Sequence, residues 1–566
     1  MDTRDAKIIA RDILANSLRA SINLRRQRIP PPDYVLLELK GEMPEREPAR
    51  RFLPQQMPFI QKALTVEALN LRLKVIAGDP DVKGVILHLG DLQIALAKAQ
   101  NIRAAIQRLK RRGKRVIAYS PVLDLPRYYV GTAADELVIP ESSTFNVKGL
   151  ASQVVFLKDT LERLGVSTDL EAIGEYKNAA DPLRRSDMSE AQREVINAIL
   201  DSFYQDLLAG VTEDRNLAKE RVDELIDHAP WLAQETVANG LADALLYEDQ
   251  IPGHLANGNG HMKIMPWEQA QMSLQRTYNW HGKQAIGVIS LRGAIVTGDS
   301  RDVPVPIPFV GVQAGSDTLA RAFRKAEKDP RIAAVVFHVD SGGGDALASD
   351  LIWREVKRLR GKKPVVAYMG DVAASGGYYV LAAADHIVAQ SATLTGSIGV
   401  IGGKIVTRGL YDKLSANWEI IQRGRHAIMD LPDDPYTEEE REKVLAQIQA
   451  TYKLFKERVA EGREMAVDDL EQIARGRVWT GRQALDFGLV DELGDFQAAI
   501  DRAKLLAGLP LDDTVPVVPI ETPKKYTPPP AFTGSQAWAR SLIDSLRPFT
   551  GTRVLALMPW TLELKG

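Results

Sequence analysis

The sequence has no cysteine among its 566 residues. Disulfide bonds, cysteine-ligated zinc and thiol catalysis are therefore excluded, although a cysteine-free chain is compatible with any redox compartment. An excess of charge of one sign is also missing, because 72 Lys and Arg residues balance 74 Asp and Glu residues to a net charge of −2. The bulk charge therefore gives no indication of nucleic acid as a partner, nor of an anionic membrane surface.

Long hydrophobic runs are missing as well. Charged side chains interrupt residues 1–28, where a secretory signal would need an apolar core of about 7–15 residues. No stretch of the sequence approaches the roughly 18 apolar residues of a membrane span. We therefore expect a soluble, cytoplasmic protein. Residues 8–24 predict a helix, and we expect this N-terminal arm to serve packing or oligomerisation, with peripheral membrane contact as the alternative.

What the sequence does contain is an internal repeat. Two short apolar runs that each hold one histidine, Val85–Leu89 and Val335–Val339, are 250 residues apart. The same spacing relates Asp79-Pro80 to Asp329-Pro330, Tyr128-Tyr129 to Tyr378-Tyr379, Asp135 to Asp385, and Gly149 to Gly399. Chance does not maintain one spacing over so many positions, so the chain is a duplicated domain.

Each copy alternates short apolar runs with amphipathic segments of helical periodicity. This alternation predicts βαβ units and an α/β fold with parallel sheets. In the second copy the predicted strands are residues 286–291, 333–339 and 365–368, and the predicted helices are residues 318–328 and 347–359. Longer helices are predicted near residues 189–211 and 437–463.

The repeat divides the chain into five predicted parts. Residues 1–32 are the N-terminal helical arm, residues 33–256 the first repeat, residues 257–283 a polar linker, and residues 284–518 the second repeat. The proline-containing tail, residues 519–566, is expected to be extended and weakly structured.

The second copy has three glycine-rich elements that the first copy lacks. They are the Gly342–Gly344 turn, Ser375-Gly376-Gly377, and Gly396-Ser397-Ile398-Gly399. Glycine allows positive φ and close backbone approach, and N–H groups at a helix start can hold a developing oxyanion. The first copy has Leu125 at the position of Ser375 and Val147 at that of Ser397. Because a purely structural role would require these elements in both copies, their loss from one copy indicates a function.

The opposite difference occurs at Lys177. When the segment that begins at Gly174 is aligned at the spacing of 250, Lys177 corresponds to Ala427. A serine kept in one half and a lysine kept in the other indicate one active site divided between the copies. A Ser–Lys dyad can replace a Ser–His–Asp triad if burial lowers the lysine pKa far below its ordinary value of about 10.4. His338 has a counterpart, His88, in the other copy and is expected to be structural.

Several motifs now resemble a known family. Ala373–Tyr379, Gly396–Ile401, Gly174–Pro182 and Arg477–Asp491 are similar to motifs of signal peptide peptidase A in its long, duplicated form. The resemblance covers about residues 33–506. It implies two tandem crotonase-like (Clp-protease-like) domains that hydrolyse peptide bonds and assemble as a homotetramer, with no cofactor or metal. The implied partners are further copies of the chain and peptide substrates, namely unfolded peptides or remnant signal peptides.

The resemblance also implies roles for individual residues. Ser375 would be the nucleophile and Lys177 the general base of a serine endopeptidase that works through an acyl-enzyme intermediate. Ser397 would hold the lysine amine by a hydrogen bond. Backbone N–H groups would form the oxyanion hole, for which the candidates are Gly376, Gly343 and Gly344.

Two other functions stay open at this point. A crotonase-like enzyme that acts on acyl-CoA thioesters would use paired N–H groups to stabilise an enolate and would need no serine nucleophile. A catalytically silent scaffold that retains a decayed site is the other possibility. The sequence also leaves open whether Ser375 meets Lys177 within one chain or across an interface.

Overall fold

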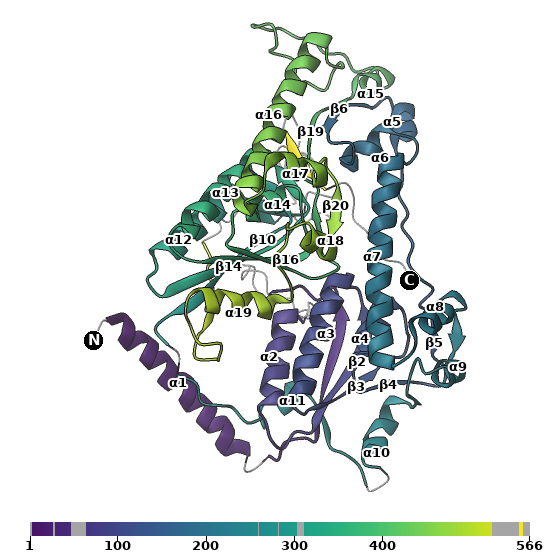
Figure 1. Cartoon of the computed structure of the whole chain (residues 1–566), viewed down its shortest axis with the longest axis vertical. Coiled ribbons are helices and arrows are strands. Elements are labelled where there is room, and N and C mark those ends of the chain that lie inside the picture. The colour runs from purple at the N-terminus through teal and green to yellow at the C-terminus, as the bar shows by residue number, and fades with distance from the viewer. Residues whose placement is uncertain are drawn as a thin grey trace.

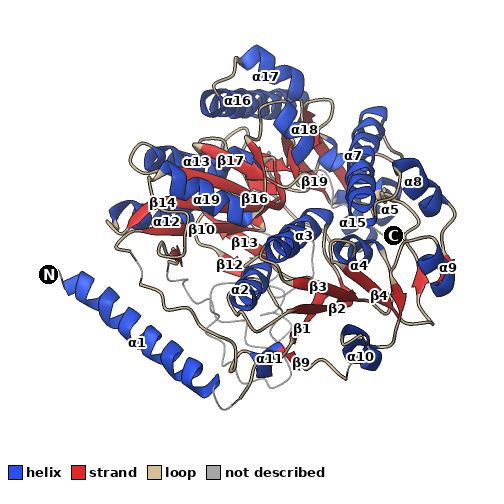
Figure 2. Cartoon of the chain, turned by 60° about the horizontal axis from the view of Figure 1, so that its bottom comes forward, coloured by secondary structure: helices blue, strands red, loops and turns tan. Residues whose placement is uncertain are grey.

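The structure is a computed structural model that describes residues 3–26, 29–46, 64–257, 260–280, 282–302, 311–522 and 554–558. Two α/β units follow one another along the longest axis, with the parallel sheet of the first repeat in the lower half of Figure 1 and that of the second repeat above it. Helices α5 (Lys158–Leu164) and α6 (Asp181–Arg184) and strand β6 (Ser167–Ile173) of the first repeat lie beside the second. Helix α1 (Thr3–Arg26) lies on the flank of the first repeat (Figure 2). The α/β architecture with parallel sheets that the sequence predicts is confirmed in both copies.

The first repeat is built on a parallel sheet with the strand order β8-β4-β3-β2-β1-β9. Helices pack on this sheet and bury its strands, which is why the strands appear in the sequence as nearly continuous apolar runs. The strands are β1 (Tyr34–Gly41), β2 (Gly84–Leu92), β3 (Arg115–Tyr119), β4 (Glu136–Ile139), β8 (Ala244–Leu245) and β9 (Ile264–Pro266), and the main helices are α2 (Val66–Ala77), α3 (Leu96–Arg111) and α4 (Leu125–Gly131).

The second repeat contains the corresponding sheet, with the order β20-β18-β16-β14-β10-β22 and with β17 and β21 extending it from β16. The predicted strands and helices of this copy are confirmed, and α13 begins 250 residues after α3. The strands are β10 (Ala285–Arg292), β14 (Ile332–Ser341), β16 (Val365–Ala374), β17 (His386–Ala389), β18 (Leu394–Gly396), β20 (Val478–Thr480), β21 (Glu492–Leu493) and β22 (Val517–Pro519), and the helices are α12 (Ser316–Lys328), α13 (Ala346–Arg360), α14 (Gly376–Leu381) and α19 (Phe496–Leu506).

A third sheet joins the two repeats. Its strand order is β12-β13-β11-β15-β23-β19-β6. Strand β6 (Ser167–Ile173) belongs to the first repeat, yet it pairs antiparallel along its whole length with β19 (Val400–Val406) of the second. Strand β23 (Leu555–Leu557) comes from the C-terminal tail, where the sequence predicts no strand. The remaining strands are β11 (Ala294–Val296), β12 (Arg301–Asp302), β13 (Val312–Gly315) and β15 (Gly343–Asp345).

The two predicted long helices are α7 (Glu190–Arg215) and α16 (Glu438–Arg463). Each begins at a residue that accepts a hydrogen bond from the first turn: Ser189 caps α7, and Thr437 caps α16 within a capping box. Helix α7 packs against β20 of the other repeat, and α16 packs against both β6 and β19. Shorter elements are β5 (Thr144–Phe145), β7 (Trp231–Leu232), α5 (Lys158–Leu164), α6 (Asp181–Arg184), α8 (Lys219–Asp227), α9 (Ala233–Ala238), α10 (Ile251–Leu255), α11 (Trp267–Ala270), α15 (Arg408–Lys413), α17 (Val467–Ile473) and α18 (Gly481–Asp486).

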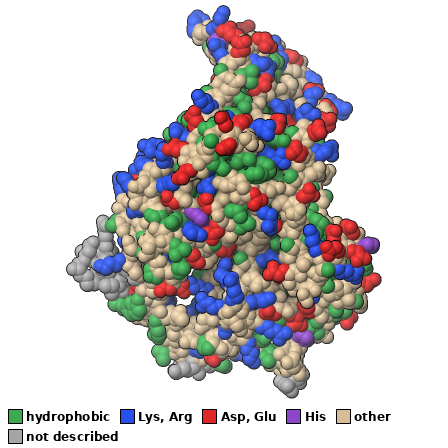
Figure 3. Space-filling view, viewed as in Figure 1, with side chains coloured by type: hydrophobic (Ala, Val, Ile, Leu, Met, Phe, Trp, Pro, Cys, Tyr) green, Lys and Arg blue, Asp and Glu red, His purple; other side chains and the backbone are tan. Residues whose placement is uncertain are grey.

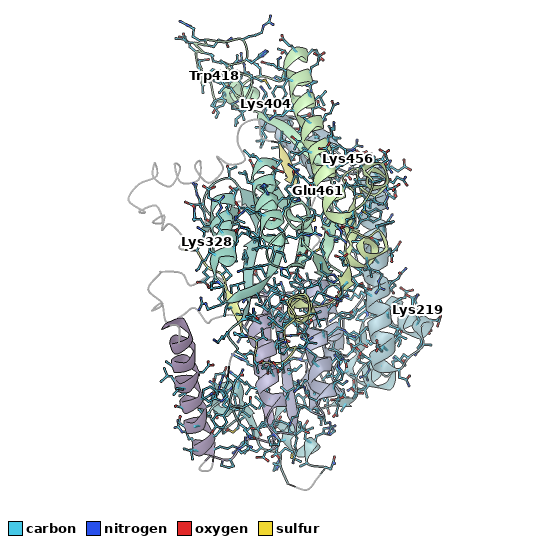
Figure 4. The ribbon with its side chains drawn as sticks, turned by 60° about the vertical axis from the view of Figure 1, so that its left-hand side comes forward. Lys219, Lys328, Lys404, Trp418, Lys456 and Glu461 are labelled. Atoms are coloured by element: carbon cyan, nitrogen blue, oxygen red, sulfur yellow. The ribbon has the colours of Figure 1, made fainter. Side chains whose placement is uncertain are left out.

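The surface shows no segregation of charge on the face seen in Figure 3, where basic and acidic side chains are interspersed. The segment that follows β19 projects at one end of the molecule, where Lys404 and Trp418 are labelled in Figure 4. Within the described ranges, none of the helices has the length and apolar character needed to cross a membrane.

The two repeats meet at a buried polar cluster. Asn101 on α3 donates a hydrogen bond to Glu45 at 3.1 Å and another to the hydroxyl of Tyr368 on β16 at 2.6 Å. Burial and the neighbouring carboxylate of Asp371 raise the pKa of Glu45 to about 8. Asp371 is itself paired with Lys98 at 2.6 Å. At neutral pH Glu45 therefore carries a proton and contributes no net charge to this interface.

Replacement of Glu45 with Gln is expected to remove part of the pH dependence of stability. The folded-state pKa of about 8 lies above the ordinary value of 4.5, so the folded state binds the extra proton between these values and loses stability as the pH rises through 8. Glu45→Gln should therefore unfold at a higher urea concentration than the wild type at pH 9 and at a similar concentration at pH 5. The exposed Glu38→Gln on β1 is the control, and equal behaviour of the two variants at pH 9 would contradict the prediction.

Candidate active site

Ser375 lies in the tight turn between β16 and α14. Its backbone has φ 56° and ψ −117°, a conformation that costs free energy for a residue other than glycine. The turn is held by hydrogen bonds from the Ser375 N–H to the Gly396 carbonyl and from the Tyr379 N–H to the Ser375 carbonyl, both 2.8 Å. A Cβ on Gly377 would lie 2.4 Å from the Ser341 carbonyl oxygen, so α14 approaches the glycine turn closely because Gly377 has no side chain. The Ser375 side chain is fully buried.

Lys177 reaches Ser375 from the other repeat. It follows β6, whose pairing with β19 sets its position, and its side chain is 1% exposed. Lys177 Nζ lies 2.7 Å from Ser375 Oγ. The same nitrogen lies 2.9 Å from Ser397 Oγ and 2.8 Å from the Ser397 carbonyl oxygen. The structure thus brings together the serine and the lysine that the two copies keep separately, within one chain.

The amine of Lys177 is buried, and among the residues that the structure describes no carboxylate contributes to the shift of its pKa. Burial lowers the pKa of Lys177 well below the ordinary value of 10.5, and it is the one cause of the shift among the described residues. An ammonium group in such a site would be strongly destabilised, so the neutral amine is favoured. A neutral amine has a lone pair with which it can accept a proton.

Ser397 is held as tightly as Ser375. It follows β18 with a positive φ of 51°, and its N–H donates to the carbonyl of Arg477 at 2.6 Å. Two strained serines therefore surround a single amine, and the backbone around each is fixed by hydrogen bonds to neighbouring segments. This is the kind of local strain that surrounding structure maintains at functional sites.

The glycine turn carries the remaining predicted residues. The N–H of Gly343 donates to Ser341 Oγ at 3.1 Å, and that hydroxyl donates to the Gly293 carbonyl at 2.6 Å. A Cβ on Gly344 would lie 2.1 Å from the carbonyl oxygen of Ile295, so this residue must be glycine. Gly376 begins α14, where first-turn N–H groups lack intrahelical partners. Helix α14 contacts β15, so all three candidate glycines lie on neighbouring segments.

Sequence reasoning missed Gly476. It has a positive φ of 80°, and a Cβ there would lie 2.6 Å from the Cβ of Lys177. The N–H of Tyr176 also donates to the carbonyl of Arg475 at 3.0 Å, so this segment forms the support on which Lys177 lies. The signal in the sequence is a glycine between two arginines directly before the motif that begins at Arg477.

His338 is not part of this arrangement. Its buried ring packs against Tyr368 and Phe496, and burial lowers its pKa to about 3. It is therefore neutral at physiological pH, which fits the structural role predicted for it. Among the residues that the structure describes, no group of three His, Asp or Glu side chains is arranged to hold a metal ion.

The chain is similar to known peptidases over most of its length. The model of peptidase family S49 matches it twice, at residues 108–260 and 357–510, once in each repeat. It is 33% identical over 507 residues to "Serine protease SPPA, chloroplastic" of Arabidopsis thaliana, covering 89% of this chain and 73% of the relative. It is 30% identical over 462 residues to "Protease 4" of Haemophilus influenzae, covering 77% and 72%. "Protease 4" of Salmonella typhi is 30% identical over 445 residues, covering 76% and 70%.

Gly476→Ala is expected to reduce the turnover of an unfolded polypeptide by at least about 100-fold, because the new methyl group displaces Lys177 from Ser375. Gly508 is a matched control: it has a positive φ of 65°, but a Cβ there meets no atom within 4 Å. Gly508→Ala should cost about 1 kcal/mol of stability from the backbone alone and leave turnover unchanged. Turnover and thermal midpoint are measured for both variants. Equal losses of turnover would refute the inference that Gly476 holds Lys177 against Ser375.

Proposed function

The chain belongs to peptidase family S49 and is a serine peptidase, and on this premise we propose that Ser375 and Lys177 form its catalytic dyad. The observation that carries the proposal is the 2.7 Å contact between Lys177 Nζ and Ser375 Oγ. A lysine with a purely structural role would have no reason to lie against a serine in a strained turn. The absence of both residues from the matching positions of the other copy supports the same assignment.

The neutral amine of Lys177 has the hydrogen-bonding capacity that a general base needs. Its two N–H groups can donate to the Ser397 carbonyl and to Ser397 Oγ, and its lone pair then faces the hydroxyl of Ser375. Ser397 is thus a positioning residue that directs the lone pair. As Ser375 Oγ attacks the carbonyl carbon of a substrate, its proton passes to Lys177 Nζ.

Backbone N–H groups are proposed to stabilise the oxyanion of the tetrahedral intermediate. The N–H of Gly376 is one donor, and the glycine turn supplies the second from Gly343 or Gly344. Collapse of the intermediate breaks the peptide bond, and the Lys177 ammonium returns its proton to the leaving amine. A water molecule then attacks the acyl-enzyme with Lys177 again as base, which regenerates the hydroxyl of Ser375.

The substrates are proposed to be unfolded peptides or remnant signal peptides. The supporting feature is the edge of β15 that the three-residue strand β23 occupies in this structure, because an extended chain can add to a strand edge by backbone hydrogen bonds. Such binding requires an unfolded segment. A folded protein cannot present its backbone to a fully buried serine.

Self-association as a homotetramer is also proposed. Helix α1 exposes apolar side chains that a second copy would cover, namely Ile13, Leu14, Leu18 and Leu24. The helix itself is held to the chain by polar contacts, such as those of Asn16 with the backbone of Asn279. The cytoplasmic location and the peripheral membrane contact considered for this arm stay predictions.

Ser375→Ala and Lys177→Met should each abolish cleavage of an unfolded protein such as casein, with thermal midpoints at or above that of the wild type. Lys177→Met keeps the shape of the side chain and removes the cost of burying an amine. A fluorophosphonate probe should label wild-type Ser375 and not Ser375→Ala, which distinguishes a peptidase from an acyl-CoA enzyme. Because both residues come from one chain, mixing the two variants should restore no activity. Near-wild-type turnover by either variant would refute the dyad.

The pH dependence of kcat/KM should report the titration of Lys177. The protonated amine cannot accept a proton, so below the Lys177 pKa the rate should rise about tenfold per pH unit, and above it the rate should be constant. Burial lowers this pKa well below 10.5, so the plateau should begin well before pH 10.5. A rate that keeps rising to pH 10.5, as for a solvent-exposed lysine, would contradict a buried general base.

A further inference from the structure

The sheet that joins the two repeats has the C-terminal tail in its interior. Strand β23 lies between β15 and β19 and runs antiparallel to both. The outer edges of these two strands are already paired, β15 with β11 and β19 with β6. Two strands that flank a third are roughly 9.5 Å apart, so without residues 555–557 the sheet would have a slot one strand wide. The strands on both sides of this slot would then expose backbone N–H and C=O groups that can pair with another strand.

The slot lies directly beside the proposed nucleophile. Gly343 and Gly344 pair with Leu557 and Ala556, and the N–H of Met558 donates to the Gly342 carbonyl at 2.6 Å. Helix α14, which begins at the residue after Ser375, contacts both β15 and β23. The tail strand therefore covers the turn that is proposed to supply an oxyanion donor. A substrate strand and β23 cannot occupy this edge of β15 together.

The tail segment is held by few contacts. Its strand is three residues long, whereas β6 and β19 pair over seven. At its ends, the Ala346 N–H donates to the Val554 carbonyl at 3.1 Å, and the side chain of Met558 is 6% exposed. Each backbone hydrogen bond adds little net stability, so a strand of this length can be displaced by a competing strand. Its advantage over a free peptide is covalent attachment, which gives a high effective concentration at the slot.

We propose that residues 554–558 are a built-in competitor that occupies the substrate slot, so that this chain blocks its own active site until a substrate strand displaces the tail. This inference rests on the proposed function, because it assumes that substrates add to β15 beside Ser375. The segment imitates an extended apolar peptide, with the sequence Val-Leu-Ala-Leu-Met. A strand that merely completed the sheet would have no reason to lie against a catalytic turn.

The kinetic test compares the wild type with a chain truncated after Thr522, which lacks β23, and with a control that lacks residues 559–566 and keeps β23. If the slot is occupied about nine-tenths of the time, removal of β23 should lower KM about tenfold and leave kcat within about twofold. The control should retain the wild-type KM. In the full chain, Leu555→Pro should lower KM in the same direction, because proline removes an N–H from the strand. An unchanged KM, or a loss of kcat together with thermal stability, would overturn the proposal and make β23 a structural strand.

A binding test separates this proposal from the dyad. A fluorescent peptide of residues 552–560 should bind the truncated Ser375→Ala chain and bind the full-length Ser375→Ala chain at least about tenfold more weakly. The same peptide with proline at the position of Leu555 is the control and should bind neither. Equal binding to both chains would overturn self-blocking whatever the catalytic residues are. Peptide binding as expected, in a protein whose turnover survives Ser375→Ala, would count against the dyad alone.

Discussion

The burial of one amine, that of Lys177, is the constraint on which the rest of this structure depends. Burial disfavours the ammonium form of Lys177 and lowers its pKa well below the ordinary value of 10.5. In the proposed mechanism the lone pair must point toward Ser375, and the contacts of Lys177 Nζ with the hydroxyl and carbonyl of Ser397 are proposed to fix that direction. The strain at Ser375 and Ser397 and the missing side chain at Gly476 all serve the same close packing around the amine.

After the duplication the two repeats kept different residues of the proposed site, instead of forming two equal sites. Each repeat retains a sheet of the same order of elements, but the first has lost the serines and the second has lost the lysine. The pairing of β6 with β19 compensates for that division, because it extends one repeat into the other and places Lys177 against its partner. The proposed dyad takes one residue from each repeat, and the hydrogen bonds of Asn101 with Glu45 and Tyr368 form part of the contact between these repeats.

The sequence was most informative where the two copies could be compared. Strands and helices of the second copy followed from periodicity, and Ser375, Ser397 and Lys177 were singled out because their counterparts in the other copy are apolar. Features that depend on contacts between residues far apart in the sequence could not be predicted in this way. The glycine between Arg475 and Arg477 does not reveal by itself that Lys177 packs against it, and the hydroxyl of Ser341 gave no sign that it would accept a hydrogen bond from the glycine turn. A three-residue strand in a proline-containing tail is too short for any periodicity to predict.

The pairing of β6 with β19 also has a consequence for the cell that makes this chain. Lys177 leaves the ribosome 198 residues ahead of Ser375, and β19 follows later still. In a nascent chain the proposed base is therefore present before the proposed nucleophile, and the contact between them requires segments from both repeats. A product that ends between Lys177 and Ser375 thus contains the lysine of the proposed dyad without its serine.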